Sequence, residues 1–325
     1  MIQFRPIYIN RPAETINGIT QKIQTIATET AIHSPRSIFL LGFLKLTAIL
    51  PMPLLSFLGR GWGRLLYWFP GRTKETTIKN LQTCFADKSE QQLASLTLKS
   101  LQHTACLAME MGKAWLIPLK KAFALVRETE GLDEFHQAVK EERGIILLAP
   151  HLGNWEIFGP YICEGVPSTF MYQPPKLESM DKLLKKTRAR NGIKLAPTNV
   201  RGVSQLIKAL KKGEMVGLLP DQVPTEEGGA YADFFAEPAW TMTLVSKLIS
   251  RTKPRVFFGY AKRLENTSGF KVVIREADSE IYSEDLQRSL NGLNKSVERC
   301  VMDCPEQYQW EYKRFRRQPD GRKFY

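Results

Sequence analysis

The sequence predicts an α/β protein with a mixed, largely parallel central sheet flanked by helices. Beyond Gly131, short apolar segments typical of buried strands alternate with longer segments of helical periodicity. Successive strand segments lie roughly 30 residues apart with a helix between them, which is the spacing of a crossover between parallel strands. The chain has 325 residues, of which 43% are hydrophobic, so it can bury a sizeable core without metal or disulfide support.

Residues 37–70 are predicted to anchor the chain to a membrane. The most apolar stretch, residues 38–58, has the length of a bilayer crossing, but Lys45, Pro51 and Pro53 interrupt it. The sequence that follows, GRGWGRLLYWFPGR, mixes Trp, Tyr and Arg as segments at a membrane interface do. A buried core hairpin is the alternative. The long succession of apolar residues favours an anchor, either spanning or half-inserted.

Residues 1–36 precede this segment as a polar arm without the features of a secretory signal, and residues 71–325 follow as one domain. The domain begins with helical patterns between residues 73 and 118, where Ser89 and Gln92 predict a capping box. The expected strands are residues 145–150, 168–173, 193–198, 214–220, 254–264 and 269–277. The expected helices between and after them are residues 132–142, 154–164, 177–192, 201–213, 241–252 and 282–304.

The chain is basic, with 46 Lys and Arg against 33 Asp and Glu and a net charge of +13. Such a surface attracts nucleic acid, anionic lipid or an acidic protein, and charge alone does not separate these partners. No nucleic-acid-binding motif accompanies the charge, so nucleic acid is not an expected partner. The five cysteines have no metal-type spacing and are expected to be reduced thiols. Neither a metal nor another cofactor is expected.

The candidate site is the segment APHLGNWEIFG, residues 149–159. His151 directly follows a strand predicted to be buried, and Gly153 permits a tight turn. Asn154 can cap the helix that begins at the next residue, which puts Glu156 in the first turn of that helix, close to the histidine. An imidazole oriented by a carboxylate is a general base for a hydroxyl, and N–H groups at the helix start could hold an oxyanion. The alternative is a turn histidine satisfied by hydrogen bonds.

Other catalytic motifs are not found in the sequence. The spacing from His151 to Glu156 does not match the H-E-x-x-H helix of zinc proteases. The chain also lacks the G-x-S-x-G turn of serine hydrolases, the phosphate-binding P-loop and a strand followed by G-x-G-x-x-G. Hydrolysis through a serine, nucleotide-driven transfer and hydride transfer are therefore disfavoured.

The run HLGNWE at residues 151–156 resembles the H-x-G-N-W-E/D signature of the late acyltransferases of lipid A biosynthesis, a branch of the lysophospholipid acyltransferase superfamily. Further family motifs follow in the same order, and the resemblance spans about residues 38–320. They are Arg188 ahead of Gly192, Arg201 at the start of the next helix, Asp221 and Gln222 in a PDQ motif, YADFFAEPAWTMT at 231–243 and PEQYQW at 305–310. Two departures are the VPTEEGG run after PDQ and Gln173 in place of an arginine before Pro174.

The resemblance implies a glycerol-3-phosphate acyltransferase-like fold in which residues 71–325 form the acyltransferase domain. It implies transfer of an acyl group from acyl-carrier protein to a hydroxyl on a 3-hydroxyacyl chain of a lipid A precursor. His151 would take the proton, Glu156 would orient the imidazole, and Arg188 would stabilise the oxyanion, with Asp221 as a possible partner of Arg188. The expected substrate-binding residues are Gly153, Asn154, Arg190, Arg201 and Gln222. The expected location is the bacterial inner membrane, with the catalytic domain on the cytoplasmic face.

The basic helix over residues 177–192 and the segment before it have two interpretations. They could attract acidic carrier protein or anionic lipid head groups, or form a solvated face, the commoner role of a charge run. The tail YKRFRRQPDGRK is expected at the membrane surface or near lipid phosphates. The basic residues of the helix and of the segment before it are Lys176, Lys182, Lys185, Lys186, Arg188 and Arg190.

Three alternative functions remain open from the sequence. An acyltransferase could act on another glycolipid or a lysophospholipid, and the same base could activate water in a thioesterase. A membrane-associated binding protein with a degenerate site is disfavoured because His151 and Glu156 are both present. The sequence does not give the acyl chain length, since no single residue identifies the floor of an acyl tunnel. The acyl position filled and the oligomeric state are also not predicted.

Overall fold

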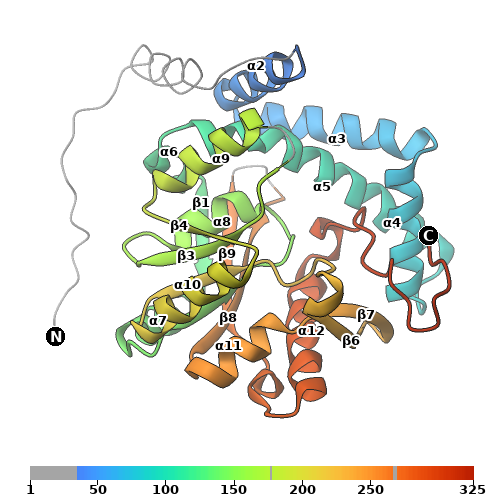
Figure 1. Cartoon of the computed structure of the whole chain (residues 1–325). Helices are drawn as coiled ribbons and strands as arrows, with labels where there is room; N and C mark the ends of the chain where they lie inside the picture. The colour runs from blue at the N-terminus through green and yellow to red at the C-terminus, as the bar shows by residue number, and fades with distance from the viewer. Residues whose placement is uncertain (1–34, 176–177, 266–268) are drawn as a thin grey trace.

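The computed structural model describes residues 35–175, 178–265 and 269–325, and most of the predicted arm therefore lies outside the described residues, as does Lys176. A seven-stranded sheet with the order β1-β9-β8-β2-β5-β3-β4 forms the centre of the molecule (Figure 1). Its strands are β1 (Val126–Glu130), β2 (Ile145–Leu148), β3 (Ser168–Tyr172), β4 (Lys194–Pro197), β5 (Met215–Leu218), β8 (Arg255–Arg263) and β9 (Phe270–Glu276).

The fold class predicted from the sequence is confirmed. Five of the strand pairings in this sheet are parallel, and only β8 and β9 pair antiparallel. All six predicted strands are present. Two features are additional: the polar edge strand β1, and a separate antiparallel hairpin of β6 (Gly229–Phe234) and β7 (Glu237–Met242).

Helices cover both faces of the sheet (Figure 1). One buried apolar cluster includes residues of α5, α7 and α8, and the other includes residues of α4, α10, α11 and α12. This double coverage explains why the central strands are apolar without interruption. The helices are α4 (Arg72–Cys84), α5 (Glu90–Leu116), α6 (Leu119–Phe123), α7 (Leu132–Lys140), α8 (Trp155–Ile162), α9 (Glu178–Ala189), α10 (Val200–Lys211), α11 (Leu244–Thr252) and α12 (Leu286–Asp303). The predicted capping box of Ser89 and Gln92 opens α5 as expected.

The apolar N-terminal segment forms two helices, α2 (Pro35–Ile49) and α3 (Met52–Trp68), with the break at Pro51. Across the described parts of the chain, no helix is both long enough and apolar enough for a membrane crossing. The spanning form of the predicted anchor is therefore not found in these residues. Both helices instead pack along α5, as Figure 1 shows.

Glycines bring α3 close to α5. A Cβ atom on Gly59 would lie 2.7 Å from the Cα atom of Cys106, and one on Gly63 would lie 2.3 Å from the Cα atom of Gln102. Two glycines one helical turn apart thus place one side of α3 against α5. The bulky apolar side chains of the same helix lie on its outer side, where they are exposed.

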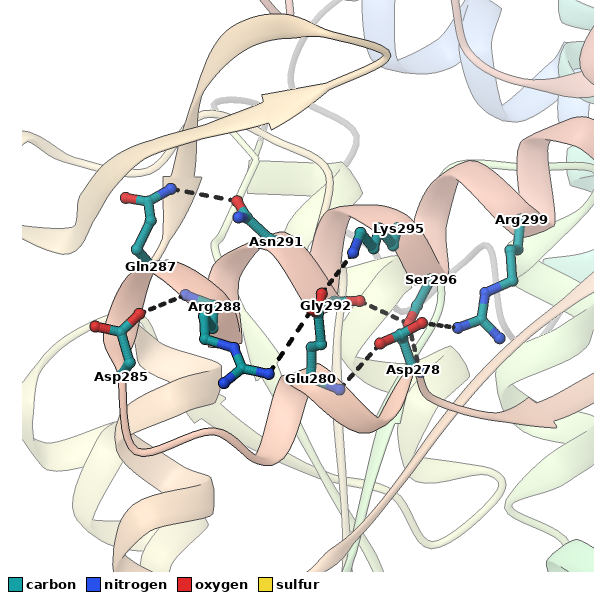
Figure 2. Close-up of polar contacts among 10 residues, drawn as sticks. All are labelled: Asp278, Glu280, Asp285, Gln287, Arg288, Asn291, Gly292, Lys295, Ser296 and Arg299. Atoms are coloured by element: carbon teal, nitrogen blue, oxygen red, sulfur yellow. Dashed lines mark hydrogen bonds and ion pairs between the residues drawn. The ribbon is translucent and has the colours of Figure 1, made fainter.

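Polar contacts link the segment between β9 and α12 to residues along much of α12, from Arg288 to Arg299 (Figure 2). Asp285 caps the helix, and Asp278 accepts from Arg299 in an ion pair. Glu280 pairs with Lys295 at 2.6 Å. These side chains are largely exposed, so each pair contributes little to stability. The C-terminal end of α12 leads to the turn that contacts the candidate site.

Candidate active site

The central polar residues of the site follow the ends of two neighbouring parallel strands. His151 follows β2, and Asp221 follows β5, the strand paired with β2. The amide N–H of Ala149 still donates to the carbonyl oxygen of Leu218 at 3.0 Å, so the segments that follow β2 and β5 separate just beyond this point. The carboxyl ends of parallel strands meet at one edge of a sheet, where ligands bind in folds of this class. The two side chains therefore converge although 70 residues separate them.

His151 and Asp221 form a buried pair. The Nδ1 atom of His151 lies 2.8 Å from Oδ1 of Asp221, and the backbone N–H of His151 donates to Oδ2 at 2.8 Å. With both carboxylate oxygens held, Asp221 fixes the orientation of the imidazole. A hydrogen on Nδ1 satisfies this pairing and leaves a lone pair on Nε2, the form that a general base requires.

The Nε2 atom of His151 faces Gln222, whose amide Nε2 lies 3.1 Å away. The Gln222 side chain is exposed, so the reactive nitrogen of a buried histidine points toward the solvent-facing side of the site. The ring of Trp155 contacts the imidazole edge to face, with 4.8 Å between ring centroids. An incoming hydroxyl would displace the Gln222 amide and donate its hydrogen bond to the lone pair on Nε2 of His151.

Charge sets the basicity of His151. Burial alone would lower its pKa, but the charge of Asp221 and the hydrogen bond to it outweigh burial, and the net shift is upward from 6.5. Burial would raise the pKa of Asp221, and the histidine together with the hydrogen bonds reverses this shift, so the pKa lies below 3.8. Glu156 adds a further upward contribution to the histidine through space.

The sequence prediction that Glu156 orients His151 is corrected by this geometry, because the carboxylate bonded to the imidazole is that of Asp221. Glu156 instead accepts two bonds from Nη2 of Arg188, at 2.9 and 2.8 Å, and one from Nε1 of Trp115 at 2.8 Å. The alternative in which Asp221 positions Arg188 is also wrong, because Glu156 does so. The site thus contains two separate charge pairs, His151 with Asp221 and Arg188 with Glu156.

Gly153 and Asn154 hold the catalytic turn in place. Gly153 has φ of +61°, and a Cβ there would lie 2.1 Å from the carbonyl oxygen of Ala261. Asn154 is 0% exposed, caps α8 through Ile157 and donates to Glu110 at 2.8 Å. Because both its amide oxygen and its amide nitrogen bond to the protein, the structure gives Asn154 a positioning role, and its predicted contact with substrate stays a prediction.

The C-terminal PEQYQW segment forms the other side of this turn. The N–H of Gly153 donates to the carbonyl oxygen of Gln307, and the N–H of Gln309 donates to that of His151, both at 3.0 Å. Tyr308 forms a bridge to the turn. Its burial, together with the nearby charge of Asp221, raises the tyrosine pKa well above 10. This segment therefore fixes the backbone on both sides of the catalytic histidine.

A further buried ion pair supports the catalytic turn. Nε of Arg263 donates to Glu110 at 2.7 Å, and its Nη2 donates to the carbonyl oxygen of Gly153 at 3.2 Å. Both residues are buried. Sequence reasoning missed this pair, although a lone acidic residue within the apolar run CLAMEMGKAWL of α5 was a usable signal. No comparable signal marks Arg263.

Replacing Arg263 by alanine is expected to lower the free energy of unfolding by about 3–5 kcal/mol, because Glu110 would remain as an uncompensated buried charge. Chemical denaturation in detergent measures this change. The matched control is Arg275→Ala, which removes an exposed arginine that pairs with Glu130 and Asp303. Its expected cost is below about 1 kcal/mol. Equal costs for the two variants would contradict the structural role of the buried pair.

The remaining predicted substrate-binding residues are Arg201 and Arg190. Arg201 is exposed in the first turn of α10, beyond the carboxyl end of β4 and roughly 14 Å across the sheet from β2. Arg190 donates through Nη1 to the carbonyl oxygen of Ile117 at 2.9 Å. Its Nε and Nη2 atoms are buried, and among the described residues they have no hydrogen-bond partner. Burial lowers its pKa. Both roles remain predictions.

The basic tail differs in part from the prediction of a membrane-surface segment. Arg314 is buried, donates to the carbonyl oxygen of Trp240 at 2.7 Å and lies against the ring of Phe234. Phe315 is also buried.

All five cysteines are buried free thiols. Within the ranges that the structure describes, no group of three or more His, Cys, Asp or Glu side chains is arranged to hold a metal.

Comparison with known proteins gives a consistent family match. The family model described as bacterial lipid A biosynthesis acyltransferase matches residues 27–317. The chain is 30% identical over 288 residues to a lipid A biosynthesis palmitoleoyltransferase of Escherichia coli (strain K12), covering 87% of this chain and 92% of that protein. It is 28% identical over 283 residues to a lauroyltransferase of the same strain, covering 86% and 91%. It is 24% identical over 273 residues to a myristoyltransferase of that strain, covering 83% and 82%.

Proposed function

The chain belongs to the family of bacterial lipid A biosynthesis acyltransferases, and from this premise we propose how it works. It transfers a fatty acyl chain from acyl-carrier protein to a hydroxyl on a 3-hydroxyacyl chain of a lipid A precursor. The observation that carries this proposal is the buried pair of His151 and Asp221, which leaves the histidine lone pair on the exposed side of the site.

The reaction begins when the acceptor hydroxyl replaces the Gln222 amide at Nε2 of His151. The histidine removes the hydroxyl proton while the oxygen attacks the thioester carbonyl carbon. Asp221 stabilises the imidazolium that forms. When the tetrahedral intermediate collapses, the carbon–sulfur bond breaks, the new ester forms, and the proton on the histidine passes to the leaving thiolate. A thioester is already activated, so no covalent acyl-enzyme is required.

Arg188 is our candidate for stabilising the oxyanion. One of its nitrogens bonds Glu156, and the guanidinium carries further N–H donors that this bond does not use. Glu156 and Trp115 hold the guanidinium in place before substrate arrives, so little reorganisation is needed during the reaction. The role of Glu156 is then to position Arg188, with its charge adding to the basicity of His151.

The acceptor lipid can remain in a membrane during the reaction. The helices α2 and α3 expose many large apolar side chains. Both helices pack on α5, which contacts the catalytic turn through Glu110. Exposed apolar area of this kind marks a membrane or partner surface. The exposed basic residues Arg60 and Arg64 of α3 suit anionic head groups. The side chains of this apolar face are Ile38, Phe39, Leu46, Ile49, Leu54, Phe57, Leu58, Trp62, Leu65, Trp68 and Phe69. We place the protein on the cytoplasmic side of the bacterial inner membrane, half-inserted through this face.

Replacing Phe57 and Trp68 together by glutamate is expected to release the protein from vesicles of anionic phospholipid. These side chains are 73% and 76% exposed, so the change alters the apolar face without opening the core. Co-sedimentation of the detergent-depleted protein with the vesicles measures the effect. The control replaces Leu286 and Met302 by glutamate, two exposed apolar side chains on α12. Undiminished sedimentation of the first variant would show that this face is not the membrane contact.

The reaction is tested with purified protein in detergent, an acyl-carrier-protein thioester and a lipid A precursor that lacks the late acyl chains. Mass spectrometry is expected to find a gain of one acyl group on the lipid. Parallel reactions with an acyl-coenzyme A donor, and with lysophospholipid or no acceptor, test the choice of each substrate. Thioester loss without any acylated lipid would identify a hydrolase, and acylation of the lysophospholipid alone would identify a different acceptor.

A further inference from the structure

A large cavity lies at the edge of the sheet opposite the candidate active site. Its volume is about 860 Å³, a size typical of small-molecule sites. Arg143 lines it just before β2, and Arg255 lines it at the first residue of β8, whereas His151 follows the carboxyl end of β2. The four residues of β2 alone span roughly 13 Å. The cavity is therefore separate from the catalytic turn.

Two segments far apart in sequence form the walls of this cavity. One is α11 with the residues that follow it, and the other is the segment 282–286, which leads into α12. In Figure 1, α11 lies at the end of the molecule away from α2 and α3. A ligand of this cavity is therefore expected to come from water and not from the membrane that the apolar face would contact.

The lining has an excess of positive charge. Within the described ranges, four of its basic side chains have no carboxylate partner. They are Arg143, Lys247, Arg251 and Lys253. Arg255, in contrast, pairs with Glu276 at 2.7 Å and with Glu141 at 2.8 Å. Glu284 is the other acidic residue of the lining, so one carboxylate faces four cations.

The acidic residues beside this wall bond to α12 and do not neutralise the cavity. Figure 2 shows Asp278 and Glu280 directed toward α12, where their partners are Arg299 and Lys295. Asp285 caps the same helix. None of these three carboxylates lines the cavity. The same contacts hold the wall against α12, so the cavity is bounded by a fixed segment on this side.

The ring of Tyr282 offers a flat surface beside the cations. It is 37% exposed, and its hydroxyl oxygen accepts from the N–H of Val256 at 2.9 Å, which holds the ring in place. Burial raises the pKa of Tyr282, and the charge of Arg143 opposes this shift, which places the cation near the ring. A planar group that stacks on this ring would therefore bring an attached anion close to the cations.

Lys253 has a backbone conformation that favours glycine. It follows α11 with φ of +47°, in the left-handed region, where a residue with a side chain costs stability. The structure records no bond between its ammonium group and the described residues. Its carbonyl oxygen accepts from Nη2 of Arg143 at 3.2 Å, a contact that glycine would also make. The fold therefore gives no reason for a lysine here, whereas an anionic ligand would.

We propose that this cavity binds a nucleoside di- or triphosphate, with the phosphates at the four cations and the base against Tyr282. Arginine and lysine donate strong charge-assisted hydrogen bonds to phosphate oxygens. The volume accommodates a ligand of this size. This binding is a function beyond acyl transfer and does not depend on it.

Isothermal titration calorimetry of the purified protein in detergent, with ATP, ADP and pyrophosphate in the presence of EDTA, tests the proposal. ATP should bind saturably and more tightly than pyrophosphate, which has no base. Arg251→Ala combined with Lys253→Gly should weaken ATP binding by at least about 10-fold, since two charge-assisted bonds are lost. The single variant Lys253→Gly should bind ATP more weakly and yet unfold no more easily than wild type, because glycine suits the positive φ.

Three further variants separate this site from general attraction to a basic surface. Lys211→Ala combined with Lys212→Ala is the matched control, because it removes two exposed cations at the end of α10, outside the cavity. Its affinity for ATP should equal that of wild type. Glu284→Gln removes the opposing carboxylate and should tighten binding. Tyr282→Leu should weaken the binding of ATP and leave that of pyrophosphate unchanged.

The outcomes decide between a nucleotide site and a basic surface. Weaker binding in Arg251→Ala with Lys253→Gly, tighter binding in Glu284→Gln and an unchanged control would establish the site. No saturable binding of either nucleotide to wild type would overturn it, as would an equal loss in the α10 control. Equal affinities for ATP and pyrophosphate, both insensitive to Tyr282→Leu, would overturn the assignment of a nucleotide. Binding of an acidic peptide such as polyglutamate in place of ATP would do the same.

Discussion

Replacing His151 by alanine is expected to reduce acyl transfer by roughly 10⁴-fold or more, because no other side chain of the site can take the proton of the acceptor hydroxyl. The alanine variant also leaves Asp221 buried without its imidazole, which lowers stability. His151→Gln avoids this problem, since its amide can still donate to the carboxylate but cannot act as a base. Initial rates of lipid acylation and unfolding midpoints should be measured for both variants.

The matched control for the catalytic histidine is His136→Ala. His136 is exposed on α7, away from the carboxyl edge of the sheet, and its removal should leave the rate of acyl transfer unchanged. A folded His151→Gln protein that keeps more than about a tenth of the wild-type rate would contradict a general-base role, since such a loss is below the smallest contribution expected of one.

Asp221→Asn is expected to lower the rate by roughly 10³–10⁴-fold, as an asparagine in place of the carboxylate does in other catalytic histidine sites. The asparagine oxygen can still accept from the backbone N–H of His151, which turns its NH₂ group toward Nδ1. That NH₂ group donates, so Nδ1 must accept and the hydrogen moves to Nε2. A histidine in this tautomer has no lone pair for the substrate hydroxyl.

Glu156→Gln provides the comparison. The glutamine keeps the hydrogen bond from Trp115 but removes the negative charge beside Arg188, so the oxyanion site is disturbed while the tautomer of His151 is not. Its loss of activity should be smaller than that of Asp221→Asn. The reverse order, with Glu156→Gln the more damaged enzyme, would return Glu156 to the role of histidine partner.

Much of the central sheet could be predicted because its strands are short apolar runs bounded by Gly, Pro or charged residues. The missed strand β1 has the sequence VRETE and lies at the sheet edge with its middle residues exposed, so no apolar pattern marks it. The hairpin of β6 and β7 turns at Phe235 and Ala236, which both have positive φ. Such a turn normally has Gly, Asn or Asp, and because these residues are absent here the hairpin was not predicted. For the same reason the start of α11 was predicted three residues early.

The catalytic turn was identifiable from its own sequence, whereas its partners were not. His151 and Glu156 are five residues apart, and local spacing favoured pairing them. Asp221 reaches His151 only because β5 lies beside β2, while β3 and β4, which come between them in the chain, lie beyond β5. Strand order of this kind is set by the packing of the whole sheet. The same holds for Arg263, which comes from β8 on the other side of β2.

The most direct test of the account is the pH dependence of kcat/KM for acyl transfer to the lipid A precursor, measured from about pH 5 to about pH 9. The neutral imidazole is the active form, and Asp221 raises its pKa, so activity should rise with pH through a midpoint above 6.5 in the wild type. In Asp221→Asn the largest contribution that opposes burial is lost, and the midpoint of the residual activity should move to lower pH. Glu156→Gln should shift it less. An acid limb below 6.5 in the wild type, or one that Asp221→Asn leaves in place, would contradict the assignment of His151 and Asp221 as the catalytic pair.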